Sequence, residues 1–222
     1  MILRRRAALA VLLLAPLAAR GQARGAPNVL DLRIDYRADS RIGDGAKPVA
    51  GRLWRTRRAL RHESREGGKP QILVLRLDRR LGWLALPELG MTIETGLDEL
   101  DLPVGILDGG AGLTQTRLGR EPRNGLETSK VRVERRAAQG ATFDGLVWAS
   151  DQGVIARIEG EAEKDAKRGR ATLDFTNFTL GPLAPSYFEP PAGLQLVRVK
   201  GADLVAMLES LAALQGLGKR QR

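Results

Sequence analysis

Residues 71–78 read QILVLRLD and residues 81–86 read LGWLAL, with only Arg79 and Arg80 between them. The first run is apolar at almost every position, which is typical of a strand buried in the middle of a sheet. The second run follows after two residues, so we expect the two to form a tight antiparallel hairpin. This hairpin sets the pattern for the chain, because most of the remaining sequence also reads as strands joined by turns.

Similar strand patterns flank the hairpin on both sides. Residues 29–36 alternate, with Leu30, Leu32 and Ile34 on one face and charged side chains on the other, as in a half-buried strand. The turn at Asn124 and Gly125 favours a hairpin. Further strands are predicted at 51–57, 60–65, 91–94, 113–121, 126–136, 142–149, 154–163 and 170–180. About ten antiparallel strands with short turns predict a mainly β (α+β) fold, a large curved antiparallel sheet or open half-barrel covered by a few helices.

Two segments interrupt the strand pattern. Residues 96–112 are rich in Leu, Asp and Gly and predict a loop with one helical turn, and residues 181–193 contain too many prolines to pair along their length. Residues 203–215 carry Leu204, Met207, Leu208, Leu211 and Leu214 at helical spacing. Asp203 can cap this C-terminal helix, which is available to cover one face of the sheet as a lid or as core.

The N-terminus has the pattern of a cleavable signal peptide. Arg4, Arg5 and Arg6 precede an apolar run over 7–17, which is too short to cross a bilayer and is followed by small residues. Cleavage after Ala23 is the favoured site, with Ala19 as the alternative and a retained anchor as the competing interpretation. We therefore predict a signal peptide at 1–23, a single domain at 24–222, and a periplasmic location.

The amino-acid composition narrows the classes of partner that the chain is expected to bind. The chain has 222 residues and a formal charge of +10, and removal of residues 1–23 takes away four arginines and no acid, which leaves 32 basic and 26 acidic residues. A spread basic surplus suits an anionic surface such as lipid headgroups, although it also fits an ordinary arginine-rich surface. No nucleic-acid-binding motif is present. Without cysteine the chain has no disulfide, thiolate metal site or lipoprotein anchor, so no permanent membrane anchor is expected.

The search for catalytic chemistry finds little. The single histidine, His62, has no nucleophile motif to accompany it and no spacing typical of a zinc site, so it is interpreted as an ordinary surface or satisfied strand residue. Asp98, Glu99 and Asp101 lack the spacing of a calcium loop. We therefore predict no catalytic residues, no metal, no cofactor and no enzymatic activity.

Apolar side chains within the predicted strands are the better candidates for a site. The three tryptophans lie in strands, where they either form core or line an apolar wall that holds a lipid or acyl chain. The candidate ligand-binding residues on this apolar face are Trp54, Leu75, Trp83, Trp148, Ile158 and Phe175.

Three segments give the chain a resemblance to a known family. They are residues 51–54 with 60–63, residues 72–78 with Trp83 and Pro87, and residues 145–148 with 153–155 and the closing stretch 186–193. Together they resemble the LolA/LolB-like (lipoprotein localisation factor-like) superfamily, and more closely its uncharacterised periplasmic relatives. The resemblance implies an open β half-barrel with a helical lid over an apolar cavity, and named members that carry lipoprotein acyl chains between membranes.

Two functions follow as expectations. The first is an exported periplasmic protein that binds or carries an apolar ligand, a lipid or a lipoprotein acyl chain, in the half-barrel cavity. The alternative is a non-enzymatic envelope module, with a protein partner and a sheet face filled by its own helix. An enzyme is the third and least favoured possibility.

Overall fold

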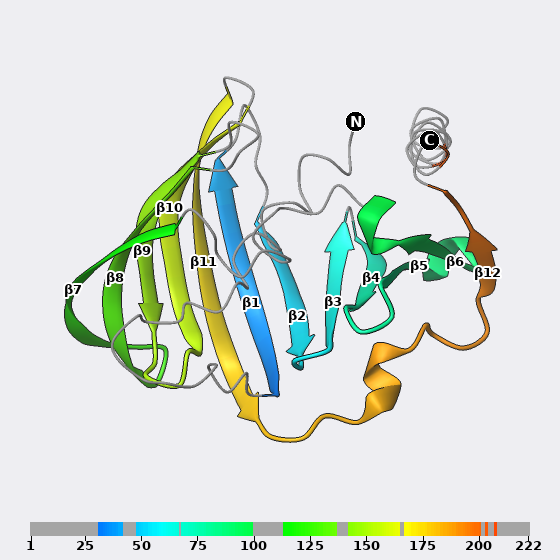
Figure 1. Cartoon of the computed structure of the whole chain (residues 1–222), viewed down its shortest axis with the longest axis horizontal. Coiled ribbons are helices and arrows are strands. Elements are labelled where there is room, and N and C mark those ends of the chain that lie inside the picture. Colours follow the sequence, from blue (N-terminus) through cyan, green and yellow to red (C-terminus); the bar gives the residue numbers. More distant parts are fainter. Residues whose placement is uncertain are drawn as a thin grey trace.

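The computed structural model describes residues 31–41, 48–66, 68–99, 113–136, 142–164 and 167–200, together with Asp203 and Met207. The twelve described strands form one sheet of order β12-β6-β5-β4-β3-β2-β1-β11-β10-β9-β8-β7 (Figure 1). All neighbours are antiparallel except β12, which runs parallel to β6. The sheet is thus a long meander whose two halves meet where β1 pairs with β11.

The strands begin and end as follows. The first half contains β1 (Leu32–Arg41), β2 (Val49–Arg55), β3 (Ala59–Glu66), β4 (Lys69–Arg76), β5 (Leu81–Leu86) and β6 (Met91–Gly96). The second half contains β7 (Leu113–Arg123), β8 (Leu126–Arg136), β9 (Thr142–Ala149), β10 (Ile155–Lys164) and β11 (Lys167–Leu180), and the chain returns to β6 with β12 (Gln195–Arg198).

The hairpin that the sequence predicted is present. Strands β4 and β5 pair with Val74 opposite Trp83, and Arg80 takes a positive φ of 52° in the turn between them. The predicted interior place of β4 is confirmed, because β3 and β5 flank it, although β2 and β1 occupy the middle of the order. The turn at Asn124 and Gly125 is also confirmed, with φ angles of 49° and 79°.

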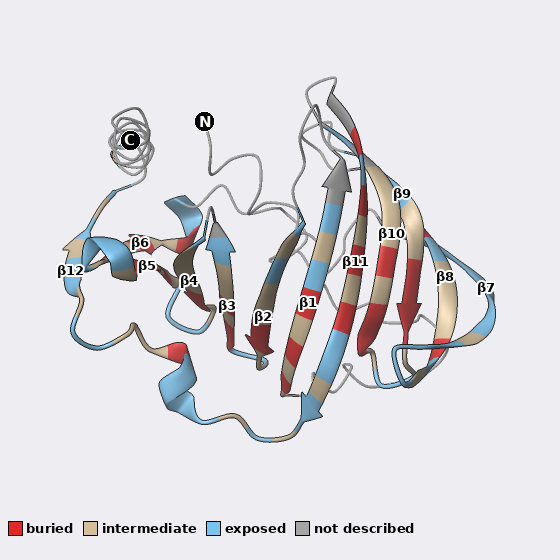
Figure 2. Cartoon of the chain, turned by 180° about the vertical axis from the view of Figure 1, so that it is seen from behind, coloured by how far each residue is buried: buried red, intermediate tan, exposed pale blue. Residues whose placement is uncertain are grey.

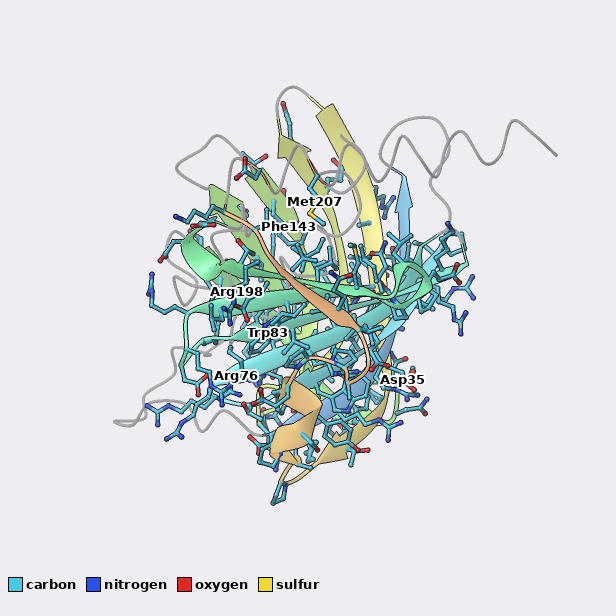
Figure 3. The ribbon with its side chains drawn as sticks, turned by 90° about the vertical axis from the view of Figure 1, so that its right-hand side faces the viewer. Asp35, Arg76, Trp83, Phe143, Arg198 and Met207 are labelled. Carbon is cyan, nitrogen blue, oxygen red and sulfur yellow. The ribbon has the colours of Figure 1, made fainter. Side chains whose placement is uncertain are left out.

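The sheet is curved and open. Its end strands β7 and β12 are not paired with each other. In Figure 3 the strands of the β2–β6 half run across the view, in front of the more upright strands of the other half. The predicted class, a large open antiparallel sheet, is therefore confirmed in its β part.

The predicted covering helices are not confirmed. Short 3-10 turns are described at η1 (Pro87–Leu89), η2 (Leu97–Glu99) and η4 (Pro185–Phe188). Of the predicted helix 203–215, Asp203 and Met207 are helical and the other residues lie outside the described part, as does the predicted signal peptide 1–23. No helix within the described ranges is long and apolar enough to cross a membrane.

The two faces of the sheet differ in what covers them. We call the face that carries Leu53 and Leu75 the core face, and the face that carries Trp54 and Trp83 the strap face. Residues 181–194, the strap, connect β11 to β12 along the lower edge of the molecule in Figure 1. Their Leu183 and Phe188 pack with the two tryptophans, so the strap covers part of the strap face.

The main hydrophobic cluster lies on the core face and extends from β4 to β8. Buried side chains of the cluster recur at every second position along β1 and β11, as the banding of these two strands in Figure 2 shows. The cluster includes Leu53, Leu75, Ile158, Leu173 and Phe175, each no more than 1% exposed. The period of two in the sequence therefore places the apolar side chains of both halves in one core.

Glycines allow aromatic rings to lie flat on the core face. A Cβ at Gly51 would lie 2.7 Å from the ring of Tyr36, and Cβ atoms at Gly145 and Gly160 would each lie 2.6 Å from the ring of Phe143. Gly145 and Gly160 are direct cross-strand partners. Such glycine positions covered by an aromatic ring are a recognised way of curving a sheet.

Candidate ligand-binding face

The six candidate residues do not share one face. Leu75, Ile158 and Phe175 belong to the main cluster on the core face. Trp54 and Trp83 belong to the cluster under the strap. The structure therefore brings together only the three residues on the core face, and whether they contact a ligand stays a prediction.

Trp148 also points away from the core face. It lies directly opposite Arg157, whereas its neighbour Val147 lies opposite Ile158 in the main cluster. The indole N–H of Trp148 donates to Glu121 at 2.5 Å, and the cations of Arg123 and Lys130 lie 5.2 and 5.1 Å from its ring centroid. All three tryptophans are thus on the opposite face from Leu75, because their neighbours in sequence alternate with them.

A row of directly opposed residues crosses six strands on the core face. Side chains at directly opposed positions lie next to one another on the same face. The row runs Ile34, Leu53, His62, Leu73, Leu84 and Ile93. It is apolar except at His62, and it joins the main cluster to a smaller cluster around Leu86 and Ile93.

His62 pairs with Tyr36 inside this apolar surface. The Tyr36 hydroxyl lies 2.6 Å from His62 Nε2, and the two side chains are 3% and 6% exposed. Burial lowers the pKa of His62 from 6.5 to about 4, and burial also raises the pKa of Tyr36. Both groups are therefore neutral across the physiological range.

Of the two interpretations of His62, the satisfied strand position is confirmed and the surface position is wrong, and the sequence contained a signal for its burial. Along β3, Leu60, His62 and Ser64 alternate with Arg61 and Glu63. The alternation places His62 on the same face as Leu60. Its partner could not be foreseen, because Tyr36 reaches across the intervening strand above Gly51.

Several apolar side chains on the core face are only half-buried. Some of them pack against the main cluster and stay partly exposed to solvent, namely Leu73, Leu77, Val131 and Phe143. The smaller cluster is likewise flanked by partly buried apolar side chains, which are Leu84, Met91, Val199 and Met207. Phe143 and Met207 are labelled in Figure 3. The core face thus has a fully buried middle and a partly accessible apolar margin.

The strap face is built differently, from rings and ion pairs. The guanidinium groups of Arg52 and Arg61 each lie within 5.7 Å of the ring centroid of Trp54, and Tyr187 of the strap stacks on the same ring. Arg61 also donates to the Tyr187 carbonyl at 3.0 Å. These cation–π, stacking and hydrogen-bond contacts hold the strap against this face.

Ion pairs continue this pattern along the strap face. Arg76 bonds to Asp78 and, at 2.5 Å, to Glu189 of the strap, and the Arg76 hydrogen bond lowers the pKa of Asp78 to about 2. Trp83 donates to Glu94, which also pairs with Arg198 of β12 (Figure 3). Charge is therefore concentrated on the face opposite the apolar row.

The described residues contain no group of three or more His, Cys, Asp or Glu side chains placed to hold a metal ion. Of the acidic loop residues, Asp98 pairs with Arg80, and Asp101 lies outside the described part.

No protein-family model matches the chain. No curated protein matches it either. Among solved structures, an uncharacterised conserved protein from Thermus thermophilus is similar at 13% identity and a TM-score of 0.51, over 78% of this chain and 93% of that one.

Two other solved structures are similar at lower scores. A LolA superfamily protein from Nitrosomonas europaea matches at 11% identity and a TM-score of 0.41, over 74% of this chain and 92% of that one. The lipoprotein LppX from Mycobacterium tuberculosis matches at 12% identity and a TM-score of 0.42, over 74% and 90%. At these identities a likeness concerns the fold alone.

Proposed function

We propose that this chain is an exported, non-enzymatic protein that binds an apolar chain of a lipid or lipoprotein along the core face. The observation that carries the proposal is the apolar row across six strands, while the ion pairs of Arg76 and Arg198 lie on the other face. Its half-buried members Leu73 and Leu84 offer apolar surface to a ligand. Covering such surface is favourable by about 25 cal/mol for each Å² removed from water.

The sequence supports the place of action. The arginine-led apolar segment at the N-terminus is typical of a signal peptide, which fits a periplasmic protein that meets lipids at a membrane surface. The basic surplus would favour contact with anionic headgroups. The bound ligand is therefore expected to come from a membrane or from a lipoprotein.

The first test is the composition of the purified protein. Protein isolated from the periplasm of a Gram-negative host should release acyl lipids into an organic extract, detected by mass spectrometry, and should bind a fluorescent fatty acid once delipidated. The variant Leu73→Gln should weaken that binding, because it places a polar amide beside the acyl chain. Leu196→Gln, at a 44% exposed position on β12, is the matched control and should bind as the wild type does. An empty protein that ignores the probe contradicts the proposal.

A second candidate is an envelope module whose sheet face is filled by its own C-terminal segment. The observation in its favour is that helical Met207 packs against the cluster of Leu86 and Ile93. A chain ending at Val199 separates the two functions. If residues after 199 are core, truncation should unfold the domain, since each exposed leucine costs roughly 1.5–3 kcal/mol. If they form a lid, the shortened chain should stay folded and bind more of a hydrophobic dye.

A further inference from the structure

The turn between β2 and β3 presents two exposed arginines, Arg57 and Arg58. Neither guanidinium forms an ion pair with a carboxylate in the part of the chain that the structure describes. In the neighbouring turn between β4 and β5, by contrast, Arg79 is paired with Glu189. A guanidinium without such a partner has its N–H donors free for an external anion. The charges of Arg57 and Arg58 are therefore available to a partner outside the chain.

Hydrogen bonds fix the backbone that presents these two side chains. The Thr56 hydroxyl accepts the backbone N–H groups of Arg58 and Ala59, at 3.1 and 3.0 Å. The Arg58 carbonyl accepts the N–H of Leu77 at 2.8 Å, which ties this turn to the one between β4 and β5. The two turns border a hollow of about 500 Å³, which is lined by Arg57, Arg58, Leu77 and Asp78. The two arginines thus stand at a preformed site.

The acid that lines this hollow already has its charge balanced. Asp78 accepts two hydrogen bonds from Arg76, at 2.9 and 2.8 Å, and this pairing lowers the pKa of Asp78 to about 2. The fourth lining residue, Leu77, packs against the main hydrophobic cluster. The hollow therefore offers an anion two unpaired guanidinium groups beside an apolar side chain.

Exposed apolar side chains lie at the same end of the sheet. Leu180, the last residue of β11, is 43% exposed and lies opposite Leu32, which in turn lies opposite Arg55 at the end of β2. Tyr187 of the strap is 44% exposed and stacks on Trp54. Figure 1 shows the strap along this lower edge of the molecule. Cations set among exposed leucine and aromatic side chains are typical of a surface that lies on a membrane.

We propose that this end of the sheet docks on an anionic lipid bilayer, with a headgroup phosphate held by Arg57 and Arg58 in the hollow. Arginine suits this partner because its planar fork of N–H donors matches the oxygens of a phosphate. Leu180 and Tyr187 lie against the headgroup layer in the docked protein. The inference rests on the proposed function for its membrane setting, and it names the surface through which the protein reaches the bilayer that supplies the ligand.

Vesicle sedimentation measures the docking directly. The protein isolated from the periplasm should bind vesicles of phosphatidylcholine and phosphatidylglycerol in equal parts more tightly than vesicles of phosphatidylcholine alone, and added salt should weaken this binding. Arg57→Gln combined with Arg58→Gln should lower the affinity for the mixed vesicles by about 25-fold, which is about fivefold for each arginine.

The matched control removes two exposed arginines elsewhere. Arg37 and Arg198 have side chains that are 67% and 79% exposed, so Arg37→Gln combined with Arg198→Gln makes the same change in net charge. This control should bind the mixed vesicles as the wild type does. Equal affinity of the wild type for the two kinds of vesicle, or an equal loss in both double variants, overturns the inference. Binding of inorganic phosphate without binding of either vesicle assigns the site to a soluble anion, which also overturns it.

A fluorescent label reports the same contact while both arginines stay in place. The chain has no cysteine, so Leu180→Cys takes up a single environment-sensitive fluorophore. Its emission should shift to shorter wavelength when the mixed vesicles are added. Leu196→Cys, at a 44% exposed position on β12, is the control and should show no shift. A shift in the labelled Leu196→Cys protein as large as that in the labelled Leu180→Cys protein contradicts docking through this end of the sheet.

Failure of the docking and failure of the proposed function give different results. The double variant of Arg57 and Arg58 should still take up the fluorescent fatty acid, because neither arginine belongs to the apolar row. A wild type that binds the mixed vesicles and ignores the fatty acid contradicts the proposed ligand alone. A wild type that binds the fatty acid and ignores the mixed vesicles contradicts the docking alone.

Discussion

The indole ring of Trp54 stacks on the ring of Tyr187, with centroids 5.8 Å apart and planes 26° from parallel. The two residues are far apart in the sequence, and the contact ties the strap to β2 on the face opposite the apolar row. Because Trp54 is held there by rings and cations, it is unavailable to the core face. This relationship separates the two sides of the sheet, one closed by the chain itself and one proposed for a ligand.

The strap should depend more on Phe188 than on Tyr187. Phe188 is buried with Trp54 and Trp83, whereas Tyr187 is 44% exposed. Phe188→Ala should lower the free energy of unfolding by about 3–5 kcal/mol, as other buried phenylalanine truncations do. Tyr187→Ala, the neighbouring control, should cost about 1 kcal/mol, the value of an aromatic pair. Urea denaturation measures both, and equal losses would show that the strap is not anchored through Phe188.

The curvature of the second half should depend on two glycines. A Cβ at Gly160 would lie 2.6 Å from the Phe143 ring and 2.7 Å from the backbone oxygen of Asp144. Gly160→Ala should therefore destabilise the fold by about 1–3 kcal/mol, the usual cost of overpacking. Gly96→Ala is the control, because its nearest contacts would lie at an ordinary 3.8 Å. If thermal denaturation finds the two variants alike, the close approach at Gly160 has no energetic weight.

Stability should fall as the pH drops from 6.5 to about 4. His62 has a pKa of about 4 in the folded protein and an ordinary value of 6.5 when unfolded. Between these values the unfolded chain binds a proton that the folded chain does not, so stability is complete above pH 6.5 and is lost by up to about 3 kcal/mol as the pH approaches 4.

A substitution isolates this contribution. Arg55 lies on the same face one row away and stays cationic, so it adds no titration in this window. His62→Leu should give a nearly flat urea-denaturation profile from pH 6.5 to 4. Asp78, whose pKa is lowered to about 2, contributes a loss of stability only at pH values below the ordinary pKa of a carboxyl group, as the pH falls toward 2. A wild-type curve that is already flat between pH 6.5 and 4 would contradict the buried neutral state of His62.

Much of the sheet could be predicted from the sequence because strand patterns and turns are local. The hairpin of β4 and β5 and the turn at Asn124 follow from short stretches with a period of two and from turn residues. β12 was missed, since its four residues pair with β6, which lies about 100 residues earlier in the chain. The covering helices could not be checked beyond Asp203 and Met207.

The candidate site was harder to predict, because the face on which a side chain lies depends on the strand register. Alternation along the strand places Trp148 and Val147 on opposite faces of the sheet. It does not say which of the two faces is the core face. Because tryptophan is largely apolar, the sequence interpretation placed the three tryptophans on the ligand-binding face. The structure places Trp54 and Trp83 under the strap. Cations lie over the rings of Trp54 and Trp148, and the N–H groups of Trp83 and Trp148 donate to carboxylates. The Tyr36–His62 pair depends on a contact across three strands that no local pattern contains.

The most direct test of the account uses the placement of the tryptophans. A dibrominated stearic acid quenches tryptophan fluorescence only on contact, and the native tryptophans all lie on the face away from the apolar row. The account predicts that the wild type is little quenched at saturation and that Leu84→Trp, on the core face, is strongly quenched. Ile72→Trp, half-buried beside the strap cluster, should behave as the wild type does. Quenching of the native tryptophans or of Ile72→Trp, with none in Leu84→Trp, would contradict a ligand on the core face.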